Sequence, residues 1–96
     1  MIYVIARAEI LPENFSEYVA ALRRLVPQVR AEDGCLGYDP CADLEGDGVG
    51  RFVTIVEKWE SKEHWQAHMK TSHMAEFRMI ARPLRVGNTV YAVTAL

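Results

Sequence analysis

The chain has 96 residues, of which 50% are hydrophobic and 25% are charged, and this predicts a single domain over residues 1–96. The net charge of −2 comes from interspersed acids and bases without a basic stripe, which argues against nucleic acid as a partner. No apolar run approaches the roughly 20 residues of a membrane span, so we expect no membrane partner and a soluble, cytoplasmic protein.

The first predicted element is a β-strand over Met1–Leu11, in which successive side chains alternate between two faces. One face is apolar throughout. The opposite face mixes the apolar Tyr3 and Ile5 with the charged Arg7 and Glu9. Such a mixture suits a surface that is partly covered by something other than the chain's own helices.

A long amphipathic helix is predicted next. Pro12 ends the strand, and apolar residues then recur at three- and four-residue spacing from Phe15 to Val29. Pro27 is expected to kink this helix near its last turn. The run Glu32 to Gly34 closes the helix, because glycine readily adopts the left-handed conformation that follows a helix.

Cys35–Leu44 is predicted as a second strand, although Gly37 and Pro40 interrupt its regularity. Such interruptions indicate a β-bulge or an edge position. Cys35 and Cys41 are six residues apart, which in an extended strand is about 20 Å and beyond disulfide reach. We therefore expect reduced thiols.

Arg51–Trp59 is predicted as the third strand, and one of its faces carries the charged Glu57 between apolar residues such as Val53 and Trp59. A carboxyl group in this position should either pair with a basic or histidine side chain in a cavity or have its pKa raised by burial. Arg7 is the structural partner that the sequence suggests.

The segment that follows holds all three histidines of the chain. Ser61 can cap a new helix, and His64 and His68, four residues apart, then lie on one side of it. The helix is expected to bend or restart at residues 71–72. That break would allow His73 to approach the face that carries His68.

A short helical pattern then stops at Pro83, and Gly87–Leu96 is predicted as the last strand. The order strand, helix, strand, strand, helix, strand is that of the α+β ferredoxin-like βαββαβ sandwich. With both helices on one face, the other face of the sheet stays open. Because this open face carries apolar side chains, a second copy stacking sheet on sheet would cover it, and we expect a homodimer.

Two segments stand out beside this strand order: EDGCLGYDP after the first helix and WESKEHWQAHMKTSHM after the third strand. Together they resemble the antibiotic biosynthesis monooxygenase family, in particular its bacterial quinol monooxygenase-like members. The most specific part is the His-x-x-Thr-x-His element formed by His68, Thr71 and His73. The resemblance implies a dimeric α+β barrel that oxygenates aromatic or quinol substrates with O₂ and needs no cofactor, whether metal, flavin or haem.

The same family also contains haem-degrading oxygenases and an isomerase that acts on a small signalling molecule, so the resemblance alone does not fix the reaction. In this chain Arg78 stands where the haem-degrading branch has its iron-ligating histidine. The sequence therefore disfavours haem.

The family-like element suggests His68 and His73 as a catalytic acid/base pair, because an imidazole that titrates near neutral pH can take the proton of a phenolic hydroxyl. The resulting electron-rich anion is what reacts with O₂. The alternative is that both are surface or helix-capping histidines, as we expect for His64. His64 and His68 also have the spacing of zinc ligands, but no third ligand is defined, so no metal is expected.

Four further residues are expected to bind the substrate, namely Tyr38, Glu57, Trp59 and Phe77. The aromatic rings could line a slot for a flat substrate, although large aromatics in a small domain are more often core, which is the interpretation favoured for Trp65. Tyr38 could donate its hydroxyl to a quinone oxygen or simply cover the sheet.

The first interpretation is thus a cofactor-independent monooxygenase that oxidises a quinol or polycyclic phenol with O₂. An isomerase that moves a proton on a small hydroxyketone would use the same histidines without O₂. A non-catalytic small-molecule-binding dimer module is the third possibility. Oxygen uptake separates the first two, and a lack of stabilisation by any such ligand would favour the third.

Overall fold

The computed structural model describes residues 1–96, which form four strands and three α-helices. None of the helices has the length and apolar character needed to cross a bilayer. Short 3₁₀ turns precede α1 and β4. In chain order the elements are β1 (Ile2–Ile10), α1 (Phe15–Arg30), β2 (Cys35–Ala42), β3 (Phe52–Trp59), α2 (Lys62–Met69), α3 (Ser72–Ala81) and β4 (Arg85–Thr94).

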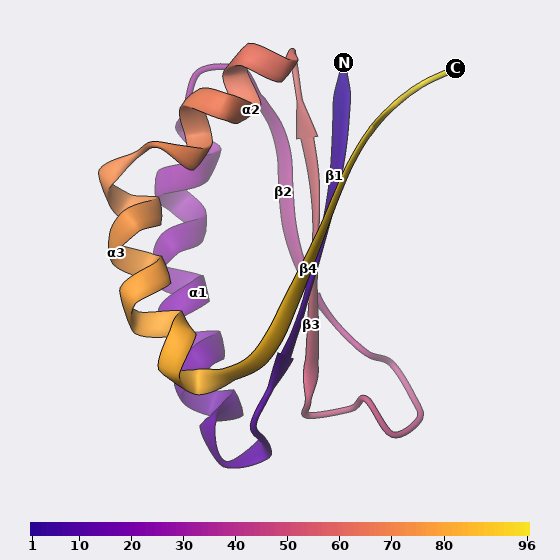
Figure 1. The fold of residues 1–96 in the computed structure, drawn as a ribbon, viewed down its shortest axis with the longest axis vertical. Helices are drawn as coiled ribbons and strands as arrows, with labels where there is room; N and C mark the ends of the chain where they lie inside the picture. Colours follow the sequence, from indigo (N-terminus) through magenta and orange to yellow (C-terminus); the bar gives the residue numbers. More distant parts are fainter.

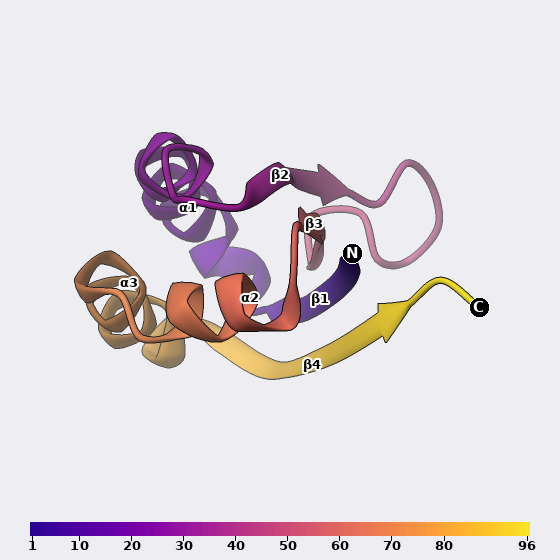
Figure 2. The same ribbon diagram turned by 90° about the horizontal axis from the view of Figure 1, so that it is seen from above.

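The strands form one antiparallel sheet in the order β2-β3-β1-β4. The helices lie on one face of this sheet, with α1 and α3 side by side and α2 leading from β3 into α3 (Figures 1 and 2). This confirms the predicted ferredoxin-like βαββαβ arrangement. The expected break after the first histidine helix is also confirmed, since α2 ends at Met69 and α3 starts at Ser72.

The core lies between the helices and the inner face of the sheet. The strand alternation predicted for β1 is confirmed, because Val4, Ala8 and Ile10 on the apolar face are buried. The spacing predicted for α1 also holds, and its inward stripe includes Leu22 and Val29. The core cluster continues through Tyr18, Tyr38, Val53, Ile55, Trp59, Met74 and Phe77.

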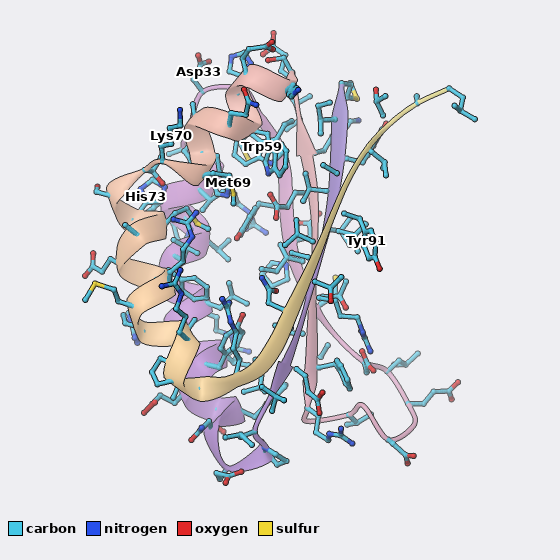
Figure 3. All side chains as sticks on the ribbon, viewed as in Figure 1. Asp33, Trp59, Met69, Lys70, His73 and Tyr91 are labelled. Carbon is cyan, nitrogen blue, oxygen red and sulfur yellow. The ribbon has the colours of Figure 1, made fainter.

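The outer face of the sheet remains open to solvent. The register aligns Ile5 with Val56 on β3 and with Tyr91 on β4, so these three side chains form a row across the sheet. Tyr91 is 62% exposed and Val56 is 41% exposed. Figure 3 shows Tyr91 pointing away from the helices. The uncovered face therefore carries an apolar row.

The loop after α1 is fastened to the start of α2. Gly34 has a φ of +79°, as its predicted role after the helix requires, and its carbonyl accepts a hydrogen bond from the Glu60 N–H at 2.8 Å. A Cβ at this position would collide with the His64 ring. Ser61 caps α2 as predicted, accepting from the His64 N–H at 3.2 Å. The loop and the helix thus hold each other in place.

Two predictions for β2 are confirmed. It is an edge strand, and its register with β3 shifts between Cys35 and Gly37, as expected for a bulge. Both Cys35 and Cys41 are free thiols.

The predicted pairing of Arg7 with Glu57 is wrong. Arg7 instead forms a bidentate ion pair with Asp43, with both N···O distances at 2.9 Å. The reason is strand alternation: Arg7 pairs with Thr54 on the outer face of the sheet, whereas Glu57 points to the inner face. The two side chains therefore lie on opposite sides of the sheet.

Candidate active site

The break between α2 and α3 directs two histidines to one point. The Thr71 hydroxyl donates to the carbonyl of His68 at 2.9 Å, at the end of α2, and accepts from the Met74 N–H at 3.3 Å, at the start of α3. One side chain thereby joins the two helices through a sharp turn. His68 lies in the last turn of α2 and His73 in the first turn of α3, so the turn brings them together.

Both histidines form a hydrogen bond to Glu32, in the loop after α1. Its Oε2 lies 2.9 Å from Nδ1 of His68 and 2.7 Å from Nε2 of His73. A carboxylate oxygen only accepts hydrogen bonds, so both of these ring nitrogens carry the proton and donate it. In the neutral imidazole, Nε2 of His68 then keeps a free lone pair. The predicted approach of His73 to His68 is confirmed, with Glu32 as the link.

His68 is the buried residue of α2, with 1% of its surface exposed. Its Nε2 lies 4.0 Å from Oε1 of Glu57. Its ring centroid is 4.6 Å from that of Trp59 and 5.8 Å from that of Tyr38. Burial lowers the pKa of His68, although the hydrogen bond and charge of Glu32 oppose this. The imidazole is therefore neutral at pH 7 and able to accept a proton.

Glu57 adds a second group that can exchange a proton near neutral pH. Burial raises its pKa to about 7, and the hydrogen bond that its Oε1 accepts from Trp59 Nε1 at 2.9 Å acts against this rise. The expectation of a carboxyl group perturbed by burial is thus confirmed. Burial also raises the pKa of Tyr38, so its hydroxyl stays a hydrogen-bond donor.

A cavity of about 90 Å³ lies between the helices and the inner face of the sheet, lined by Tyr38, Glu57, His68 and Phe77 among others. Of the residues expected at the site, Trp59 does not line the cavity. It is fully buried beside Glu57 and His68, between α2 and the sheet (Figure 3). Trp65, expected as core, is half-buried and forms part of the cavity wall.

His73 occupies a different position from His68. It does not line the cavity but borders a separate surface depression together with Arg24, Gln28 and Glu76. His73 therefore reaches the cavity only through the oxygen of Glu32 that it shares with His68. His64 lies outside both, with its Nδ1 2.7 Å from the Ser61 hydroxyl.

Sequence reasoning missed Glu32 as a site residue and treated it only as the end of a helix. It lies 36 residues before His68 and 41 before His73, and no spacing rule links such distant positions. The available signal was an acidic residue opening the family-like segment EDGCLGYDP.

Glu32, His68 and His73 also form the set of side chains that could hold a metal ion, since their ligand atoms lie within 4.8 Å of one another. His64, which was paired with His68 from sequence spacing, is not a member of this group. In this structure the same three groups are joined by two hydrogen bonds.

Comparison with known proteins places this geometry in context. Residues 1–79 match the model of the antibiotic biosynthesis monooxygenase family. Probable quinol monooxygenase YgiN from Escherichia coli is 37% identical over 60 residues, and the match covers 56% of this chain and 57% of the relative. The match therefore spans just over half the length of this curated relative.

Solved structures extend the likeness over the whole chain. A crystal structure of an antibiotic biosynthesis monooxygenase has 26% identity and a TM-score of 0.90, covering 100% of this chain and 99% of the other. A protein from Mycobacterium tuberculosis has 27% identity and a TM-score of 0.89, with 99% and 94% coverage.

Proposed function

Since the chain belongs to the antibiotic biosynthesis monooxygenase family, we propose that it is a cofactor-independent monooxygenase that oxidises a quinol or related phenol with O₂. The family and the likeness to a probable quinol monooxygenase support an enzyme of the monooxygenase type. The observation that carries the finer proposal is the Glu32–His68 hydrogen bond. It leaves Nε2 of a neutral histidine free in the wall of a cavity.

In the first step, Nε2 of His68 takes the proton of the substrate hydroxyl. The Glu32 carboxylate, 2.9 Å from Nδ1, holds the ring in the required tautomer and stabilises the imidazolium that forms. This division of labour is that of the histidine and carboxylate in a hydrolase triad, with a phenol in place of the serine. His73 binds the same carboxylate oxygen and positions it.

The quinol anion then supplies the electrons. One atom of O₂ is inserted at a ring carbon and the other leaves as water, so that a quinol and O₂ become a hydroxyquinone and water. No external reductant is needed, because the quinol provides the electrons itself. The Tyr38 hydroxyl and the protonated form of Glu57 can donate hydrogen bonds to the oxyanions that develop.

We also propose that the enzyme is a homodimer. The row of Ile5, Val56 and Tyr91 and the neighbouring pair of Tyr3 and Val93 form an apolar area on the outer face of the sheet, which the helices of the same chain cannot reach. A second sheet packed on this face would bury it in an interface of the large, apolar kind typical of obligate dimers.

An oxygen electrode tests the proposed activity. The purified protein is given a panel of quinols, and we expect O₂ consumption that depends on the enzyme and falls at least tenfold in His68→Ala. His64→Gln, which changes an imidazole outside the cavity, is the matched control and should retain the rate. Quinol turnover without O₂ uptake, or equal rates in both variants, would contradict the proposal.

One observation favours a second function. Nε2 of His68 and the Glu57 carboxyl group, with its pKa raised to about 7, lie 4.0 Å apart and could move a proton between adjacent carbons of a hydroxyketone. Such an isomerase would consume no O₂. The same electrode experiment, run with hydroxyketones and followed by product analysis, separates the two functions.

A further inference from the structure

The cavity carries two arginines that the proposed mechanism does not use. Arg78 reaches it from α3 and Arg85 from the first residue of β4, and both are half-buried. Glu57 on β3 is the cross-strand partner of Val4 on β1, whereas Arg85 on β4 is the cross-strand partner of Ile10 on β1. These rows are six residues apart on β1, about 20 Å at the rise of an extended strand. The backbone of Arg85 therefore lies toward the end of the cavity opposite Glu57, whereas Arg78 donates to the carbonyl of Met69, next to His68, and its charge lowers the pKa of His68.

Neither arginine has a carboxylate partner. The arginines that do are Arg7, Arg30 and Arg51, all away from the cavity. Arg78 donates one N–H to the carbonyl of Met69 at 2.7 Å. A guanidinium has five N–H donors, so most of those on Arg78 remain available.

Arg85 lies next to the hydroxyl of Tyr18 in the cavity wall. Burial raises the pKa of that hydroxyl, and the nearby charge of Arg85 opposes the rise. The acidic groups near the site, Glu32 and Glu57, stand at the histidine end of the cavity. Two half-buried guanidinium groups without a carboxylate partner in the wall of one cavity therefore favour an anionic ligand.

The size of the cavity limits what can lie beside that anion. A cavity of about 150 Å³ is known to hold benzene, and this one encloses about 90 Å³ before it opens to solvent. Its apolar wall includes Phe77, Met74 and Val90. A single aromatic ring already needs more space than this cavity encloses and would extend into its opening, and fused rings would extend much further.

We propose that the substrate is a single-ring quinol or phenol with a carboxylate substituent, which Arg85 binds while a ring hydroxyl faces His68. This inference rests on the proposed oxygenase function and narrows its substrate from polycyclic phenols to acidic monocyclic ones. It also gives Arg85 a role in substrate selection.

Binding without turnover tests this substrate class. Isothermal titration is carried out under anaerobic conditions with 2,5-dihydroxyphenylacetate and with its primary amide, which has the same ring and hydroxyl groups but no charge. We expect the acid to bind about ten- to a hundredfold more tightly, because hydrogen bonds to charged groups contribute more than neutral ones. Equal affinities, or no binding of either compound at millimolar concentration, would overturn the proposal.

Substitution of Arg85 shows whether this residue causes the preference for the acid. In Arg85→Gln the preference for acid over amide should fall to less than about threefold, and Arg85→Lys should keep part of it. The matched control is Arg82→Gln, at an exposed arginine outside the cavity on the adjoining turn, which should keep the full preference. Thermal denaturation confirms that each variant is folded. An acid preference that survives in Arg85→Gln would overturn the role of this residue.

Oxygen uptake, measured separately, distinguishes failure of this inference from failure of the proposed function. Tight, arginine-dependent binding of the acid without O₂ consumption would refute the oxygenase and leave the anion site standing. O₂ consumption with equal affinity for acid and amide would retain the oxygenase and refute the anion site.

Discussion

Glu32→Gln is expected to slow turnover far more than it destabilises the protein. Glutamine keeps the shape of the side chain and can still accept hydrogen bonds, but the negative charge between His68 and His73 is lost. Two charge-assisted hydrogen bonds, at 2.9 and 2.7 Å, become ordinary ones. Each loses about 1 kcal/mol, so the free energy of unfolding should fall by about 2 kcal/mol. For a domain of this size that lowers Tm by about 10 °C.

The effect of Glu32→Gln on the rate has a separate cause. The imidazolium that His68 becomes during proton transfer loses its counter-charge, so we expect the rate to fall by about 10² or more, within the range typical for loss of a general base. Glu32 also raises the pKa of His68 against the effect of burial. Without it, the pH at which the rate begins to rise should move lower.

The assay is O₂ uptake at saturating quinol between about pH 5 and 9, with thermal denaturation of the same preparations. Glu63→Gln is the matched control, because Glu63 is an exposed carboxylate on α2. It should leave both rate and Tm unchanged. A Glu32→Gln variant with the wild-type rate and pH profile, or one whose rate falls only in proportion to its unfolded fraction, would refute the role assigned to Glu32.

His68→Ala should lower the rate by about 10² to 10⁴, and His73→Ala should lower it less, because His73 acts only through Glu32. O₂ uptake measures both, and a larger loss for His73→Ala would contradict the geometry. Burial raises the pKa of Glu57 from 4.5 to about 7, so the folded chain holds this proton more tightly than the unfolded chain. The resulting stability is complete below pH 4.5 and is lost as pH rises through 7. Urea denaturation should therefore show that the free energy of unfolding of Glu57→Gln, relative to that of the wild type, rises by about 3 kcal/mol between pH 4 and 8. A difference that does not change with pH would mean that Glu57 titrates normally. Tyr91→Asp should convert the dimer to monomers in light scattering, and a wild-type protein that is already monomeric at micromolar concentration would rule out the dimer.

The fold could be predicted almost completely from the sequence, because its determinants are local. Alternation in β1, helical spacing in α1 and the left-handed Gly34 each act within a few neighbouring residues. The Ser61 cap is equally local, and it predicted where α2 begins. The order of these elements along the chain then predicted the ferredoxin-like fold.

The site was less predictable, because it depends on contacts between distant parts of the chain. Glu32 joins the histidines across a separation that no periodicity encodes. The distinct positions of Trp59 behind the cavity and Trp65 in its wall depend on how α2 is rotated against the sheet. The incorrect Arg7–Glu57 pairing came from charge matching without regard to the two faces of the sheet.

In the proposed mechanism this chain oxygenates a quinol with its own side chains and without a cofactor. The most direct test is single-turnover oxidation of a quinol under ¹⁸O₂ by chelator-treated protein, with the product analysed at once by mass spectrometry. The mechanism predicts a hydroxyquinone with one labelled oxygen atom, the other label in water, and loss of both products in His68→Ala. A quinone without label, or a reaction that stops when metal is removed and returns when it is restored, would contradict the claim.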